Sequence, residues 1–220
     1  MENMTLLDFA RGPGLQWALW IFFFGVLWRV VGAMFLLGTK DRSKHRRNHY
    51  IRDGLRACLT RSAPAHAFEE KIRFQHLTGY AWHIALFVSV LLFAPHILFF
   101  ESLLGFGWPH LPNTIILFSA AIAIGVLIAL LIRRATHPVQ RLISNVDDYV
   151  SILVVLLPLI SGVLAFAHVG ARYETLLALH LLSVELLMIW YPFGKLMHTI
   201  MTFPSRYQSG TFFGHRGVKA

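Results

Sequence analysis

The chain has 220 residues, of which 56% are hydrophobic and only 14% are charged, and its formal net charge is +9. A soluble domain of this size normally carries about 25% charged residues, so the composition excludes a disordered protein and an ordinary cytosolic one. The single cysteine, Cys58, excludes an internal disulfide framework, a CxxCH attachment motif and a self-contained iron–sulfur cluster, which needs four ligands. The unusual residue type is histidine, with 12 copies.

Five apolar stretches follow one another along the chain. A helix needs roughly 20 apolar residues to cross a bilayer core of about 30 Å. The stretches that qualify are residues 14–38, 77–100, 113–132, 148–167 and 176–200. The first is too long for a signal-peptide core and no small-residue cleavage site follows it, so we interpret it as a retained span. The sequence predicts an all-α membrane protein, a five transmembrane helix bundle that forms a single domain over residues 1–220.

The basic residues predict the orientation of this bundle. Seventeen of the twenty lysines and arginines fall in segments 39–76 and 133–147 or in the tail from residue 195. Short cytoplasmic connections are enriched in such residues, so we expect the N-terminus outside and the C-terminus in the cytoplasm of a cell inner (cytoplasmic) membrane. We expect the basic run at 40–47 to contact anionic lipid of the bilayer, and no nucleic acid. Residues 65–74 read as a short amphipathic helix that leads into the second span.

Histidines inside the spans are the candidate chemistry. His180 and His198 are 18 residues apart, which on a continuous helix is five turns on one face and a rise of about 27 Å. Each needs a partner at the same depth on another span. His83 matches the depth of His198, and His96 matches that of His180 if Pro95 kinks or unwinds the second span. We therefore expect the pairs His83 with His198 and His96 with His180.

Paired neutral imidazoles above and below one metal are the ligation of a low-spin b-type haem. Zinc fits less well, because its structural sites want three or four tight ligands. His168, at the outer end of the fourth span, is the alternative to His96. Arg29, Arg133 and Arg134 are candidates to bind haem propionates. The competing interpretation of each histidine is a hydrogen bond between helices.

Several segments resemble one known family. The motif LHLL…YPFGKLMH, which contains His180 and His198, resembles that family's LHL…FPFSRLIH with the same spacing between the histidines. AWHIALFVSVLLFAPH resembles the family's span that starts with FHI, and RRATHPVQR resembles its RR…SP…R turn. The family is the gamma subunit of respiratory nitrate reductase, a membrane dihaem cytochrome b, and the resemblance covers most of the chain.

The resemblance implies a bundle of five helices with two haem b groups, each held by two histidines. By position, His83 and His198 would bind the inner haem and His180 the outer one. The family's fourth ligand falls on Phe93 here, and His96 is the substitute; without it the chain would hold one haem. The family has a lysine before the third span that is associated with quinol binding. Here that region reads GWPHLPNT without a lysine, and His110 is its nearest basic group.

The sequence therefore predicts a membrane b-type cytochrome subunit. A menaquinol or ubiquinol docks near His96, His110 and His180, and electrons reach a cytoplasmic iron–sulfur partner subunit of a larger oxidoreductase complex. With a low-potential partner the flow reverses and reduces quinone. The alternatives are a hydrogenase- or formate-dehydrogenase-type cytochrome b and a haemless membrane anchor. Glu185, in the middle of the fifth span, is expected to make a hydrogen bond to a neighbouring helix or to serve a proton route.

Overall fold

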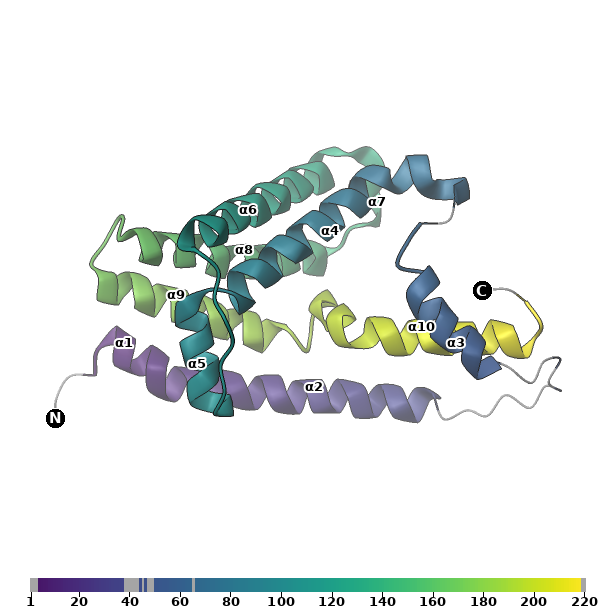
Figure 1. Cartoon of the computed structure of the whole chain (residues 1–220), viewed down its shortest axis with the longest axis horizontal. Helices are drawn as coiled ribbons and strands as arrows, with labels where there is room; N and C mark the ends of the chain where they lie inside the picture. The colour runs from purple at the N-terminus through teal and green to yellow at the C-terminus, as the bar shows by residue number, and fades with distance from the viewer. Residues whose placement is uncertain (1–3, 38–43, 45, 47–49, 65, 219–220) are drawn as a thin grey trace. The chain divides into compact units, whose positions relative to one another are not determined.

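A computed structural model describes residues 4–37, 44, 46, 50–64 and 66–218. These residues form helices and no strand, which confirms the predicted all-helical fold for the described part of the chain. In chain order the helices are α1 (Leu6–Phe9), the π-helical turn η1 (Ala10–Gly14), α2 (Leu15–Leu37), α3 (Tyr50–Thr60), the 3₁₀ turn η2 (His66–Phe68), α4 (Glu69–Leu91), α5 (Ala94–Leu104), α6 (Asn113–Thr136), α7 (Pro138–Ile143), α8 (Val146–Ala167), α9 (Tyr173–Trp190), the 3₁₀ turn η3 (Lys195–Met197) and α10 (His198–His215) (Figure 1).

Within the described residues, four helical segments are long and apolar enough to cross a membrane. They are Leu6–Leu36, Asn113–Thr136, Val146–Ala167 and Tyr173–Trp190. Helices α4 and α5 pass the same test together but are bent by 65° at a short break, and they make a fifth span if they are counted as one. The chain thus has the helices of a multi-pass membrane protein, with four or five candidate spans among the described residues against the five predicted. The part of the predicted basic run at 40–43, 45 and 47 lies outside the described residues.

The chain divides into two compact units, residues 1–20 with 74–190 and residues 21–73 with 191–220. In the first unit, α8 packs against α6 and α9. Asn145 is the N-cap of α8 and forms a reciprocal capping box with Asp148. The Asn145 side chain accepts from the backbone N–H of Asp148, and the Asp148 carboxylate accepts from the backbone N–H of Asn145. Asp148 also lies 3.0 Å from the Arg134 guanidinium, which joins the end of α6 to the start of α8.

In the second unit, α3 packs along α10 (Figure 1). Glycine permits the close approach, because a Cβ built on Gly54 would lie 2.6 Å from Thr211 and one built on Gly210 would lie 2.6 Å from Ala57. Arg206 of α10 donates to the Ser62 hydroxyl at 3.0 Å. The amphipathic segment predicted at 65–74 is helical in its described part, as η2 followed by the first turns of α4.

The predicted continuous helix over residues 176–200 is wrong. Helix α9 ends at Trp190, and α10 begins at His198 after the turn η3. The break contains Pro192, which has no N–H to donate and whose ring clashes with the preceding helical turn. His180 and His198 therefore do not lie on one unbroken helix, and the five-turn argument that placed them on one face no longer applies.

Candidate cofactor-binding site

The second predicted span breaks immediately before His96. Helix α4 ends at Leu91 and α5 starts at Ala94 with Pro95 in its first turn, so the kink expected at this proline is present (Figure 1). A break of this kind frees backbone carbonyls, because the carbonyl of residue i normally accepts from the N–H of residue i+4. In a membrane these carbonyls need new donors.

Three consecutive carbonyls at the break have such donors. The Val90 oxygen lies 3.0 Å from Nδ1 of His96, the Leu91 oxygen accepts from the indole N–H of Trp108 at 2.6 Å, and the Leu92 oxygen accepts from the backbone N–H of Leu111 at 2.9 Å. A carbonyl oxygen only accepts, so Nδ1 of His96 carries the ring proton. The break thus fixes the tautomer of His96 and leaves Nε2 as its basic nitrogen.

His180 on α9 is fixed by a chain of hydroxyl groups. Its Nδ1 lies 3.2 Å from Oγ of Ser161, which lies 2.9 Å from Oγ of Ser183 and 3.3 Å from the Pro158 carbonyl. Ser183 donates its own proton to the carbonyl oxygen of His180 at 2.6 Å. Ser161 has one proton and three possible acceptors, Ser183, Pro158 and Nδ1 of His180, so these contacts hold the His180 ring in place whichever of its nitrogens carries the ring proton.

The two rings lie together in the first unit. Their centroids are 6.2 Å apart and their planes are within 12° of parallel. A metal bound at about 2.0–2.1 Å to one nitrogen of each of two opposed imidazoles holds the ring centres roughly 6 Å apart. The Phe93 ring packs edge-on against His96 at 5.1 Å. The spacing, the near-parallel planes and the Nδ1–H tautomer of His96 fit the donor set of a bis-histidine haem.

Gly162 on α8 leaves the space that the His180 ring occupies. A Cβ built on Gly162 would lie 3.0 Å from Cε1 of His180 and 3.3 Å from its Nδ1. Any larger residue would push the ring away from its position. His168, the alternative partner, ends α8 in the left-handed conformation with φ 55°, and its ring stacks on Tyr173 at 4.8 Å. The structure places His96, and not His168, beside His180.

The second predicted pair is divided between the two units. His83 lies half-buried on α4 in the first unit, and its Nδ1 lies 2.6 Å from the Gly79 carbonyl. His198 lies exposed at the start of α10 in the second unit, with Nδ1 2.8 Å from the Lys195 carbonyl. Each ring therefore carries its proton on Nδ1. The pairing of His83 with His198 stays a prediction.

The basic side chains predicted to bind haem propionates or a quinol differ in burial and in their partners. The Arg133 guanidinium lies 4.4 Å above the ring of Phe74, and its Nη1 is buried without a hydrogen-bond partner among the described residues. Arg134 is paired with Asp148. Arg29 is exposed on α2 and His110 is exposed in the loop before α6. Arg133 is thus the arginine with an unused buried donor.

Sequence reasoning missed two contributors. The first is Trp108, which donates to a carbonyl freed at the break. The signal that could have identified it is an indole N–H in the loop that follows a proline-broken helix. Gly14 was also missed. Glu185 is 5% exposed, its Oε1 has no hydrogen-bond partner in the described part of the chain, and a Cβ built on Gly14 would lie 2.6 Å from its Oε2. The carboxyl group packs directly against the π-helical turn.

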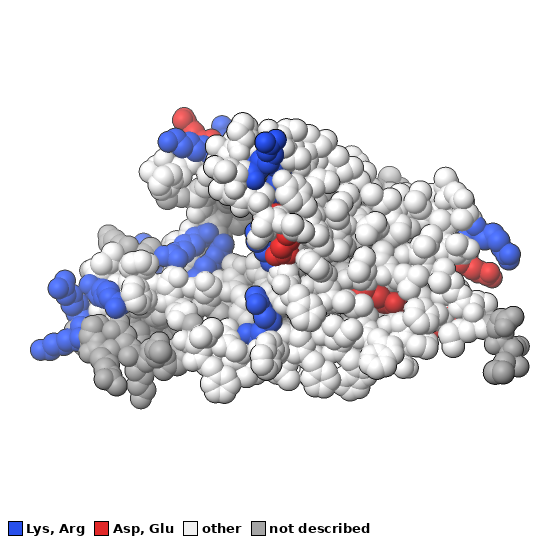
Figure 2. Space-filling view, turned by 180° about the vertical axis from the view of Figure 1, so that it is seen from behind, with Lys and Arg blue, Asp and Glu red and all other residues white. Residues whose placement is uncertain are grey.

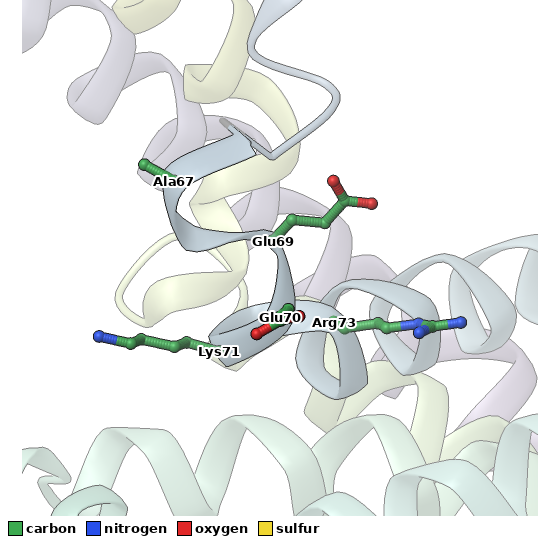
Figure 3. A pocket seen from close by; sticks show the side chains of 5 residues that line it. All are labelled: Ala67, Glu69, Glu70, Lys71 and Arg73. Atoms are coloured by element: carbon green, nitrogen blue, oxygen red, sulfur yellow. The ribbon is translucent and has the colours of Figure 1, made fainter.

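Two further features do not add a site. A shallow hollow at the start of α4 is lined by Ala67, Glu69, Glu70, Lys71 and Arg73, and Figure 3 shows the side chains of Lys71 and Arg73 pointing away from each other. Among the described residues, no three His, Cys, Asp or Glu side chains gather as metal ligands. A haem needs only two axial protein ligands, so this finding does not conflict with the pair of histidines.

Comparison with known proteins gives one relative. The chain is 30% identical over 206 residues to a protein of Nitratidesulfovibrio vulgaris strain Hildenborough described as "Protein", and the match covers 92% of this chain and 91% of the relative. No protein-family model and no solved structure matches the chain. The extent and the identity of the match show that this chain belongs to the same family as the protein of Nitratidesulfovibrio vulgaris.

Proposed function

We propose that the chain is a membrane b-type cytochrome subunit that moves electrons between the quinone pool and a cytoplasmic iron–sulfur subunit. The observation that carries this proposal is the pair His96 and His180, with centroids 6.2 Å apart, planes within 12° of parallel and, at His96, a proton on Nδ1 that leaves Nε2 as the donor nitrogen. The resemblance of LHLL…YPFGKLMH and AWHIALFVSVLLFAPH to the nitrate reductase gamma subunit supports it from the sequence.

In this proposal, His96 and His180 would hold the outer haem, and His83 and His198 would hold the inner haem. When bound, a haem supplies reversible one-electron chemistry. The carbonyl of Val90 holds the His96 ring in the tautomer whose Nε2 can bind a metal, and the hydroxyl of Ser161 holds the His180 ring in place. Arg133 is the candidate partner for a propionate, because its buried Nη1 has an unused donor in the described part of the chain.

The quinol site is proposed beside the outer pair, near His96 and His180 with His110 in the loop before α6. The cytoplasmic face is proposed from the charge distribution, with the N-terminus outside and the basic segments inside a bacterial-type inner membrane. One cysteine cannot hold an iron–sulfur cluster, so the cluster belongs to a separate partner subunit.

Haem content of single histidine variants tests the proposal. The purified chain should show an alpha band in its reduced-minus-oxidised spectrum and two haem b groups by pyridine haemochrome assay. H96A, H180A, H83A and H198A should each lose one haem, whereas H168A should keep both, because the His168 ring stacks on Tyr173 instead. A colourless chain identifies a haemless anchor and overturns the proposal. Full haem content in both H96A and H180A would show that this pair of histidines does not bind haem, and would overturn the proposal.

A further inference from the structure

Helix α3 is short, amphipathic and outside the predicted spans. Its 11 residues are too few to cross a bilayer. Ile51, Leu55 and Leu59 follow each other at intervals of four residues, so they form one stripe along the helix. Their exposed fractions are 53%, 60% and 77%. An exposed aliphatic stripe over the whole length of a helix is costly in water.

The other two faces of α3 are not apolar and exposed, since one is packed on α10 and the other is basic. One side packs on α10 through Gly54 and Ala57, which are buried. The side that continues from the stripe, away from α10, carries the exposed Arg52 and Arg56. A helix with an apolar stripe flanked by arginines has the pattern of helices that lie in the plane of a bilayer surface. Figure 2 shows Lys and Arg side chains gathered over the end of this unit that holds α3 and α10.

The connections of α3 also keep it within reach of a bilayer. It starts 13 residues after Leu37, the last residue of α2, which belongs to an apolar segment long enough to cross a membrane. Its packing partner α10 begins eight residues after the end of α9, another such segment. The residues between α2 and α3 are rich in Lys and Arg, which anionic headgroups attract.

We propose that α3 lies in the membrane interface and binds anionic lipid, with the stripe Ile51–Leu55–Leu59 in the acyl boundary and Arg52 and Arg56 on the headgroups. The helix is thereby a lipid-binding surface of the second unit. This inference does not depend on the bound cofactor. Protein partners of the second unit then dock on surfaces other than this stripe.

Fluorescence of the full chain in nanodiscs tests the inference. A bimane label is placed at Leu55→Cys, or at Thr60→Cys on the polar side as the control, in a Cys58→Ser background that keeps a donor toward the Phe203 carbonyl. The discs contain phosphatidylcholine alone or mixed with phosphatidylglycerol. The label at position 55 should shift to the blue and be quenched by spin-labelled lipid, more strongly with phosphatidylglycerol, whereas the label at position 60 should stay water-like.

The double variant R52A/R56A should lose the part of the shift at position 55 that depends on phosphatidylglycerol. Water-like emission at position 55 in both lipid mixtures overturns the proposal. So does a blue shift that appears only after a soluble cell extract is added, because the stripe would then bind a protein. An equal shift at position 55 in the two mixtures, unchanged in R52A/R56A, overturns the anionic preference.

Discussion

Gly162 of α8 lies directly against the ring of His180 on α9, where a Cβ would stand 3.0 Å from Cε1 of the imidazole. This distance is shorter than ordinary van der Waals contact, so the position of the ring depends on the absence of a side chain. The contact joins two helices that pack along each other in the first unit.

We expect G162A to displace the His180 ring. The methyl group should cost about 1–3 kcal/mol of unfolding free energy, as overpacking of a buried site does. Under the proposed function, the displaced ring should also broaden or shift the alpha band of the outer haem, measured by low-temperature reduced-minus-oxidised spectroscopy. The matched control is G125A on α6, because nothing lies within 4 Å of a Cβ there. G125A should be neutral or stabilise by about 0.5–1 kcal/mol, and equal effects of the two variants would contradict the contact.

Trp108 supplies the donor that the proline break requires, and W108F removes that donor while keeping an aromatic ring at the position. The Leu91 carbonyl would lose its partner, at a cost of about 0.5–1.5 kcal/mol in unfolding free energy measured by SDS titration in micelles. Because the same loop also donates from Leu111 to Leu92, amide exchange at Leu111 should become faster. W17F, on a 68% exposed tryptophan of α2, is the control. Unchanged exchange at Leu111 would show that Trp108 does not hold the break.

The sequence predicted where the helices lie better than it predicted how the histidines are arranged in space. Apolar length alone predicts the membrane-spanning helices, and Pro95 predicts the break before His96 because a proline removes a backbone donor. The pair His96 and His180 followed from depth matching combined with that break. The tautomer of His96 could not be predicted, because it depends on the Val90 carbonyl, which becomes available only when the helix breaks.

The errors have physical reasons as well. The apolar run 176–200 looked continuous because Leu, Met, Trp and Phe surround Pro192, and hydropathy does not register the lost N–H. Helix α3 was missed because its arginines and Asp53 lower its average hydropathy. Its amphipathic pattern was the available signal, since period 3.6 separates Ile51, Leu55 and Leu59 from Arg52 and Arg56.

Gly14 and Glu185 form a second close contact, between η1 and α9. In G14A the new Cβ would lie 2.6 Å from Oε2 of Glu185, so we expect a loss of about 1–3 kcal/mol of unfolding free energy. The double variant G14A/E185A should recover part of this loss, with a coupling energy of about 0.5–3 kcal/mol in a double-mutant cycle. G12A in the same turn should be close to neutral, because a Cβ on Gly12 meets nothing within 4 Å. Additive effects of G14A and E185A would show that the two residues do not touch.

Gly210 of α10 lies against the backbone of α3, and its substitution should separate these two helices. A Cβ there would stand 2.6 Å from Cβ of Ala57 and 2.6 Å from the carbonyl oxygen of Asp53, and a backbone oxygen cannot rotate out of the way. In G210A we therefore expect faster hydrogen exchange along α3 and a loss of the hydrogen bond from Arg206 to Ser62, now 3.0 Å. G32A on α2, with nothing within 4 Å of its Cβ, should leave exchange in α3 unchanged. If α3 keeps its protection in G210A, the helix is held by the bilayer surface and not by α10.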